Sequence, residues 1–243
     1  MCSGRTNQEL ISNLRREGLI HSTRVAEAMA KVDRKAYCPD PRSAYQDSPQ
    51  TIGYSATISA PHMHAHAAEE LLEYLKPDSS VLDVGSGSGY LAALFHHLVK
   101  PMPGHEGEVS GAHSGSRVIG IEHIEPLVKQ SVENMKTDGL SDAMSKGQIE
   151  VVLGDGRKGW PARAPYNAIH VGAASPPSVI DALEAQLAKP GRLFIPVEDP
   201  ASGAQDIYHV DKDESGKVTR KKMYGVRYVP LTDADKQWTR TEL

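Results

Sequence analysis

The sequence feature that most constrains the fold is a short apolar run that breaks into alternating glycines and then continues as an apolar helical pattern. It spans residues 81–90 and reads VLDVGSGSGY. A strand, a glycine turn and a helix in this order are typical of the start of a nucleotide-binding type of α/β domain. Glycines let the backbone come close to a ligand, and the following helix N-terminus presents unpaired N–H groups. The pattern therefore predicts a cofactor site without naming the cofactor; a glycine-rich loop with no ligand is the alternative.

Strand and helix patterns alternate along the chain after this turn. The first helix pattern runs to Val99. Later strand patterns lie at 118–121, 149–153, 168–171 and 193–197, and later helix patterns lie at 126–135 and 176–187. This alternation predicts a mostly parallel, doubly wound α/β sheet covered on both faces. Two further strand patterns, at 207–210 and 218–229, flank the turn-like residues 211–216 and predict an added antiparallel hairpin.

The residues before the glycine turn predict a helical addition to this domain. Amphipathic helices are expected within 6–18 and 25–32, an irregular stretch at 44–60 and a helix at 61–75. With 243 residues, of which 39% are hydrophobic, the chain can bury a full core, so we expect one domain over 1–243. Its expected parts are the N-terminal helices and loop (1–60), the cofactor-binding core (61–200) and the C-terminal strands (201–243). Residues 101–116, rich in Pro, Gly, Ser and His, are interpreted as an inserted, mobile surface loop.

Composition excludes some classes of partner. The 31 acidic and 27 basic side chains give a formal charge of −4, so no general attraction to nucleic acid or to anionic membranes is expected. The basic run 220–222 is interpreted as a solvated strand face. The two cysteines, Cys2 and Cys38, have no short metal-ligand or redox spacing, which favours a reducing compartment. The polar N-terminus and the lack of a long apolar run predict a soluble, cytoplasmic protein.

The spacing of the glycines bears on which cofactor is bound. The dinucleotide fingerprint is Gly-x-Gly-x-x-Gly/Ala, whereas here Tyr90 takes the place of the last small residue. A pyrophosphate is therefore disfavoured, and a nicotinamide-dependent oxidoreductase remains only an alternative. S-adenosylmethionine has no phosphate; it requires a close backbone approach and acidic partners for its ammonium and its ribose hydroxyls.

Three acidic residues, each just beyond or at the end of a predicted strand, match those requirements. Asp83 is expected near the amino acid end of the cofactor, Glu122 at the ribose hydroxyls and Asp155 at the adenine amino group. All three fall at the carboxyl edge of the predicted sheet, where open α/β sheets bind ligands. Each acid taken singly could instead be a turn or cap residue.

Several segments along the chain together resemble one enzyme family. They are DSPQTIG at 47–53, ATISAPHMHA at 56–65, LDVGSGSG at 82–89, GDGR at 154–157, AIHVGAA at 168–174 and VPLTD at 229–233, with QW at 237–238. Together they closely resemble the protein-L-isoaspartate (D-aspartate) O-methyltransferases. The resemblance extends from about Asn7 to Trp238, and its main departures are the loop 101–116 and the tips near Ala201 and Glu214. The segment from Ala56 to His64 is far more specific to the family than the glycine turn.

The resemblance implies a Rossmann-like class I S-adenosylmethionine-dependent methyltransferase that repairs aged proteins. It implies methyl transfer to the free carboxylate of L-isoaspartyl residues, and more weakly to D-aspartyl residues. The product ester converts through a succinimide towards normal aspartyl, and S-adenosyl-L-homocysteine is released. Damaged proteins and peptides are then the partners, with no nucleic acid or membrane, and the protein is expected to be a monomer. A non-catalytic adaptor of the same fold that recognises isoaspartyl chains is the alternative.

The expected chemistry needs little from the enzyme beyond alignment. An isoaspartyl carboxylate has a reference pKa near 4, so at neutral pH it can attack a sulfonium methyl group without a general base or a metal. Alignment of the reacting atoms can contribute roughly 7–11 kcal/mol. The resemblance makes Ser59 the catalytic residue, as a hydroxyl near the reactive carboxylate. Its implied substrate-binding residues are Ala56, Thr57, Ile58, Ser59, Ala60 and His64. Its implied cofactor-binding residues are Ala56, Thr57, Ile58, Ser59, His64, Asp83, Gly85, Ser86, Gly87, Gly89, Glu122, His123, Asp155, Gly156 and Thr232.

The histidines and one tryptophan have structural interpretations as well. No metal site is expected at His62, His64 and His66, because alternate positions on a helix point in different directions. The pair at 96–97 is expected on a helix surface. For His170 a structural and a functional role stay equally open. Trp238 is expected to pack rather than to stack on a substrate.

Overall fold

The computed structural model describes residues 2–100 and 115–238. They form a seven-stranded sheet with the order β5-β4-β3-β6-β7-β8-β9. Its strands are β3 (Ser80–Val84), β4 (Arg117–Glu122), β5 (Ile149–Leu153), β6 (Tyr166–Val171), β7 (Leu187–Glu198), β8 (Gln205–Lys212) and β9 (Val218–Val226). The pairs from β5 to β7 are parallel, whereas β7, β8 and β9 pair antiparallel. The predicted mostly parallel sheet with a C-terminal antiparallel hairpin is confirmed. Of the predicted inserted loop 101–116, all but the last two residues lie outside the described residues.

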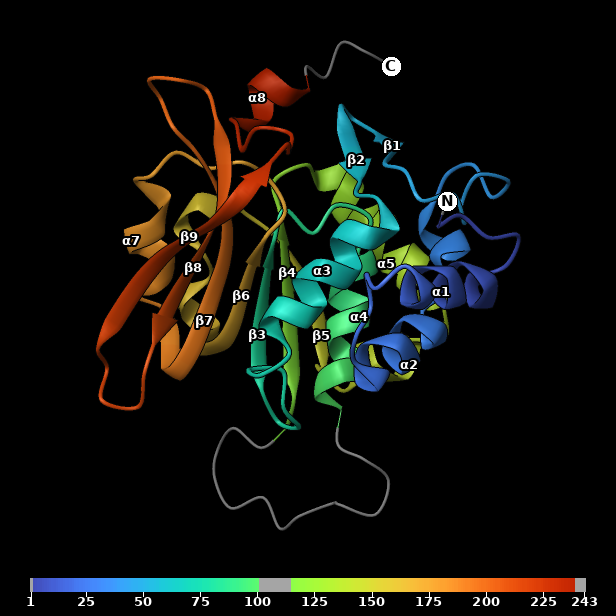
Figure 1. Cartoon of the computed structure of the whole chain (residues 1–243), viewed down its shortest axis with the longest axis horizontal. Helices are drawn as coiled ribbons and strands as arrows, with labels where there is room; N and C mark the ends of the chain where they lie inside the picture. The colour runs from blue at the N-terminus through green and yellow to red at the C-terminus, as the bar shows by residue number, and fades with distance from the viewer. Residues whose placement is uncertain (1, 101–114, 239–243) are drawn as a thin grey trace.

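Helices cover the two faces of the sheet unequally. One face packs against α1 (Asn7–Arg16), α2 (Thr23–Lys31), α3 (Pro61–Leu71), α4 (Tyr90–Val99) and α5 (Glu125–Thr137). The other face packs against α7 (Val179–Glu184), with the 3-10 turns η2 (Gly156–Lys158) and η3 (Pro161–Arg163) nearby. Figure 1 shows α1 to α5 together on one side of the strands and α7 on the other. The side chains of β3 alternate between these two faces. Val81 packs in the apolar cluster on the side of α1 to α5, whereas Leu82 and Val84 pack in the cluster on the side of α7.

The irregular stretch predicted at 44–60 contains a hairpin instead. Strands β1 (Gln50–Gly53) and β2 (Ala56–Ile58) pair antiparallel, and the turn between them holds Tyr54 and Ser55 at φ values of 55° and 53°. The two central positions of such turns usually carry Gly, which has no Cβ, or Asn, which tolerates positive φ. Tyr54 and Ser55 are neither, so these positions did not indicate a hairpin.

Other boundaries also differ from the predicted ones. The helix predicted for 61–75 ends at Leu71, and α7 is shorter than the 176–187 expected. Two short helices, α6 (Ser141–Ser145) and α8 (Ala234–Gln237), were not predicted, and the 3-10 turn η1 (Arg34–Tyr37) follows α2. The expectation that His96 lies on a helix surface is wrong: it is 2% exposed because α4 is enclosed on nearly all sides, and burial lowers its pKa to about 4.

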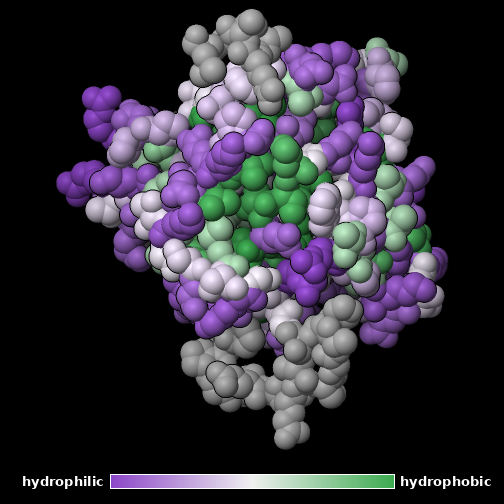
Figure 2. Space-filling view, turned by 180° about the vertical axis from the view of Figure 1, so that it is seen from behind, coloured by the Kyte–Doolittle hydropathy of each residue, from purple (hydrophilic) through white to green (hydrophobic). Residues whose placement is uncertain are grey.

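The surface is mostly polar, with a hydrophobic region on one face. Seen from behind, hydrophobic residues gather in the middle of the molecule and polar ones surround them (Figure 2). Among the described residues, the large hydrophobic side chains that remain exposed are Leu153 and Val229. No helix within 2–100 or 115–238 combines the length and the apolar character needed to cross a membrane.

Candidate active site

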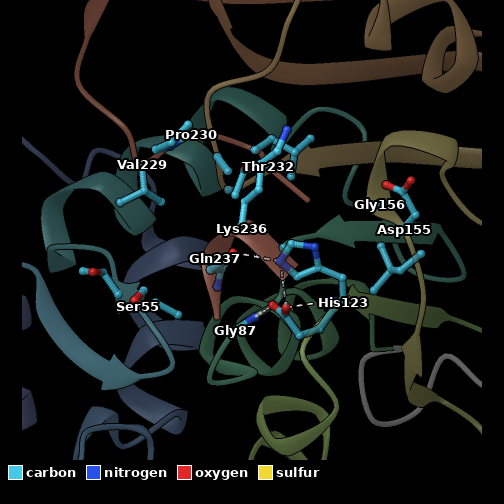
Figure 3. Close-up of a pocket in the computed structure, with 18 residues that line it drawn as sticks. Ser55, Gly87, His123, Asp155, Gly156, Val229, Pro230, Thr232, Lys236 and Gln237 are labelled. Atoms are coloured by element: carbon cyan, nitrogen blue, oxygen red, sulfur yellow. Dashed lines mark hydrogen bonds and ion pairs between the residues drawn. The ribbon is translucent and has the colours of Figure 1, made fainter. Parts of the chain in front are cut away.

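A cavity of about 420 Å³ lies where the parallel strands β3, β4 and β6 end, at the carboxyl edge of the sheet (Figure 3). Segments far apart in sequence form its wall. They are 55–57, 85 and 87, 121–123, 155–156, 172–173, 229–232 and 236–237. A smaller cavity of about 40 Å³ adjoins it and shares Thr57, Gly85, Gly87 and Gly172. The site therefore has one large and one small compartment on either side of the glycine turn.

The glycine turn is held against the end of β4. Gly87 has φ of 50°, and its N–H donates to Oε2 of Glu122 at 3.1 Å, while Oε1 accepts from the backbone N–H groups of His123 and Ile124 at 2.8 and 3.0 Å. This carboxylate is buried, yet it lines the large cavity. Each carboxylate oxygen has two lone pairs, so Glu122 can fix the turn and still accept from a ligand hydroxyl.

Gly89 has a different role from the other glycines of the turn. It is the N-cap of α4 at φ of 85°, and a Cβ placed on it would lie 2.6 Å from Cε of Met135 and 3.1 Å from Cβ of Ser131. The residue faces α5, away from both cavities. The structure thus gives Gly89 a packing role, and Gly89 lines neither of the two cavities; its cofactor contact stays a prediction.

Asp83 has one oxygen in use and one free. It lies opposite His170 in the parallel register of β3 and β6, and Oδ1 is 2.8 Å from Nδ1 of His170. Because a carboxylate only accepts, the ring nitrogen must donate. Oδ2 is buried and has no partner among the described residues, and Asp83 lines the small cavity. A buried carboxylate oxygen without a donor fits the ammonium group of a bound amino acid moiety.

His170 is placed by aromatic packing as well as by Asp83. Its ring stacks on Phe194, with centroids 5.7 Å apart, and meets the edge of Phe95 at 6.0 Å. It also lines the small cavity. Both interpretations of His170 therefore have support, since it is a satisfied buried histidine that orients a site carboxylate.

Asp155 pairs with a cation beside the large cavity. Nε and Nη2 of Arg157 donate to its two oxygens at 2.8 and 3.0 Å, and these bonds hold the pKa of Asp155 below its usual range. Nη1 of the same guanidinium is 2.8 Å from Oδ1 of Asp233. Arg157 thereby ties the cavity wall to the C-terminal segment that carries Thr232.

The C-terminal segment closes one side of the large cavity. The backbone of Ala174 bonds with Val229 and Leu231 at 2.8 and 2.7 Å. Oε1 of Gln237 lies 2.8 Å from Nε2 of His123 (Figure 3). Nε2 of Gln237 donates to the carbonyl of Tyr54 at 3.2 Å, so Gln237 links the segment after β4 to the turn between β1 and β2. Trp238 meets Tyr54 edge-on at 5.0 Å, which agrees with the expected packing role.

Ser59 follows β2 and lines the small cavity together with Thr57, Ile58 and His64. Ala60, by contrast, is buried and serves as the N-cap of α3, where its carbonyl accepts from the N–H groups of Met63 and His64. The structure gives Ala60 a structural position rather than a cavity-lining one.

The three alternate histidines of α3 divide between two sides of the helix: His62 and His66 line one surface cavity together, and His64 lies on another side. Nδ1 of His62 lies 2.9 Å from Oδ1 of Asp47, and Nδ1 of His66 lies 3.0 Å from the hydroxyl of Tyr224. His64 alone turns into the small cavity. No group of three or more His, Cys, Asp or Glu side chains suited to a metal occurs in the described part of the chain.

Most residues expected in the site therefore lie around the two cavities. The large cavity is lined by Ala56, Thr57, Gly85, Gly87, Glu122, His123, Asp155, Gly156 and Thr232. The small cavity is lined by Thr57, Ile58, Ser59, His64, Asp83, Gly85, Ser86 and Gly87.

Sequence reasoning missed several residues of the cavity wall. Gly172 and Ala173 follow β6 directly, so the rule applied to Asp155 after β5 could have found them. Lys236 and Gln237 do not follow a strand of the sheet. They lie on α8, which buries none of its residues, so no apolar pattern marks this helix in the sequence.

Comparisons with known proteins agree with this geometry. Residues 5–236 match the family model for protein-L-isoaspartate(D-aspartate) O-methyltransferase. The chain is 47% identical to protein-L-isoaspartate O-methyltransferase 1 of Arabidopsis thaliana, over 95% of this chain and 93% of that protein. It is 45% identical to the protein-L-isoaspartate O-methyltransferase of Caenorhabditis elegans, over 98% and 97% of the two chains.

A solved structure is also similar along nearly the whole chain. It is a Plasmodium falciparum protein described as a protein-L-isoaspartate O-methyltransferase in complex with S-adenosyl-L-homocysteine. The two chains are 32% identical with a TM-score of 0.79, over 94% of this chain and 99% of the other. On these matches, the chain belongs to the protein-L-isoaspartate (D-aspartate) O-methyltransferase family.

Proposed function

We propose that this protein transfers a methyl group from S-adenosylmethionine to the free carboxylate of L-isoaspartyl residues, and more weakly of D-aspartyl residues, in damaged proteins. The ester formed converts through a succinimide towards normal aspartyl. One observation carries the proposal: the unpartnered oxygen of Asp83 and the hydroxyl-bearing Ser59 line the same small cavity, which opens beside the larger one. A site for an amino acid moiety and a polar group for a second carboxylate thus adjoin each other.

The residues divide between the two compartments. Asp83 accepts from the ammonium end of the cofactor and Glu122 from its ribose hydroxyls, while His123, Gly156 and Thr232 enclose its adenosine end in the large cavity. When bound, S-adenosylmethionine supplies an electrophilic methyl group. Ser59 donates a hydrogen bond to the substrate carboxylate and holds it in line, a contact to a charged acceptor that contributes roughly 1.5–3 kcal/mol. None of these roles requires a proton to leave the substrate, because its carboxylate is already ionised at neutral pH.

The test uses labelled S-adenosylmethionine and a pair of peptides that differ only in an aspartyl or isoaspartyl linkage. We expect base-labile methyl transfer to the isoaspartyl peptide alone. Ser59→Ala should lower turnover roughly ten- to hundred-fold and leave the thermal unfolding temperature unchanged, because it removes one hydrogen bond to a charged group. Equal methylation of both peptides, or full turnover by Ser59→Ala, contradicts the proposal.

The same assay separates the enzyme from a non-catalytic adaptor that recognises isoaspartyl chains. An adaptor would bind the isoaspartyl peptide without transferring label. The position of Asp83, with its oxygen free for a cofactor, favours the enzyme.

We also propose that the chain acts as one domain, as a monomer, in the cytoplasm, with proteins rather than nucleic acids or membranes as its partners. Both cysteines are free thiols, which supports a reducing compartment. Light scattering during gel filtration tests the oligomeric state, and a mass of twice 26.3 kDa would overturn the monomer.

A further inference from the structure

Arg34 is a buried cation without an anionic partner. The residue opens η1 in the N-terminal addition and is 0% exposed. Nη2 donates to the carbonyl of Ser59 at 2.8 Å, the guanidinium lies 5.5 Å from the ring centre of Tyr90, and Nε has no partner among the described residues. No ion pair of Arg34 with a carboxylate occurs in that part of the chain. Burial of an unpaired charge is costly, so a gain elsewhere must account for this position.

The remaining contact of Arg34 is with His64. Nη1 lies 3.3 Å from Nδ1 of that ring. A guanidinium carries donors and no acceptor, so Nδ1 can only accept. The proton of a neutral imidazole then sits on the other nitrogen, Nε2. His64 lines the small cavity, and within the described residues nothing pairs with its Nε2.

We propose that Arg34 is a positioning residue for the cofactor: it fixes His64 as the tautomer with Nε2–H, which donates to the carboxylate of the cofactor's amino acid end. This inference rests on the proposed function. Asp83 in the same cavity is the acceptor for the ammonium, so the two ends of an α-amino acid meet a fixed acceptor and a fixed donor. The bond from Arg34 to the Ser59 carbonyl holds the substrate loop on the same guanidinium.

The surroundings of His64 support a permanently neutral ring. Facing it are Arg34 from η1, the ring of Tyr90 from α4 with centroids 4.8 Å apart, and Asp83 and His170 across the small cavity, with His62 on its own helix. Burial first, and then the charge of Arg34, hold the pKa of His64 well below its usual range. With Nδ1 accepting from Arg34, the single proton of the neutral ring stays on Nε2.

The test measures binding of S-adenosyl-L-homocysteine by calorimetry between pH 5.5 and 8. The wild type should bind with a Kd that does not change across this range. In Arg34→Met the ring is free to change tautomer, so binding at pH 8 should be about ten-fold weaker, the lower end of a hydrogen bond to a charged group. Burial, the larger cause of the low pKa of His64, remains in this variant, so its weaker binding should persist across the whole pH range.

Three further variants isolate the effect. The double variant Arg34→Met, His64→Asn should lose less affinity than the two single variants added together, because both act through one hydrogen bond. Arg34→Lys should keep the wild-type Kd because it retains a charged donor. Arg24→Met is the matched control: this arginine also lies in the N-terminal addition and donates to the carbonyl of Leu98 at 3.0 Å, away from the cavities. It should lower the unfolding temperature and leave the Kd unchanged.

Nitrogen NMR of His64 in the wild type reads the tautomer directly and does not depend on any variant folding. A proton on Nδ1, or titration of His64 between pH 6 and 8, overturns the inference. So does an Arg34→Met protein that binds S-adenosyl-L-homocysteine as tightly as the wild type at pH 8. Failure of the wild type to bind S-adenosyl-L-homocysteine would instead refute the proposed function.

Discussion

Replacement of Asp83 by Asn should raise stability and weaken cofactor binding. Oδ2 of Asp83 is a buried acceptor without a donor, and Asp83 is 1% exposed. Leaving such a group unsatisfied costs about 1–3 kcal/mol, more when it is charged. Asn removes the charge but still buries an amide without a partner. We therefore expect the free energy of unfolding to rise by about 1 kcal/mol, the lower end of that range. For a chain of this size that corresponds to a rise of roughly 2–4 °C in Tm.

The orientation of the new amide determines the loss of binding. His170 donates to Oδ1, so the carbonyl oxygen of Asn must stay there and its NH₂ group must replace Oδ2. A donor would then face the cofactor's ammonium. Loss of a hydrogen bond between charged groups is worth roughly 1.5–3 kcal/mol, or about ten- to hundred-fold in Kd.

Two measurements on the same protein test this reasoning. Thermal unfolding without ligand gives the stability, and calorimetry with S-adenosyl-L-homocysteine gives the Kd. Asp206→Asn is the control, because Asp206 pairs with Lys222 on the hairpin at 2.6 Å and lines neither cavity. It should lower or preserve Tm without changing the Kd. A less stable Asp83→Asn protein with unchanged affinity would refute the assignment of Oδ2 to the ammonium.

Further variants test packing and pH dependence. Gly89→Ala should destabilise the protein by about 2 kcal/mol or more, because a left-handed alanine costs roughly 1–2 kcal/mol and its Cβ would press on Met135. Its Kd for S-adenosyl-L-homocysteine below the unfolding temperature should equal that of the wild type, whereas a large increase would restore Gly89 to the cofactor site. Burial lowers the pKa of His96 to about 4. As the pH falls from about 6.5 to 4, this imidazole is therefore protonated in the unfolded chain and still neutral in the folded one. The stability that His96 contributes is complete above about pH 6.5 and is lost below it, and His96→Leu should therefore reduce the drop in Tm between pH 7 and 5. Parallel Tm curves for variant and wild type would contradict this.

The core of the fold follows from local patterns, and so does much of the site. The apolar run, glycine turn and helix at 81–90 fix one strand end, and acids such as Asp83 and Glu122 fall at the carboxyl edge because the strands are parallel. These inferences need only the order of elements. The family resemblance added Ser59 and His64, which no periodicity reveals.

The features that escaped prediction depend on contacts between distant segments. Arg34 ends an ordinary amphipathic pattern, and its burial beneath Ser59 is decided by how the N-terminal addition packs. The hairpin turn at Tyr54 and Ser55 lacks the usual turn residues. The polar side chain of His96 favours an exposed position, yet the helix that carries it is buried on nearly all sides.

The bond from Gln237 to Tyr54 joins positions 183 residues apart. We expect such a long-range contact to form late in folding, after local helices and neighbouring strands. The polar contacts of Gln237 and the packing of Trp238 on Tyr54 together hold this wall of the cavity. We therefore expect a partly folded chain to lack the complete pocket and to bind no cofactor. Ligand binding then stabilises only the finished native state, by mass action on the last step of folding.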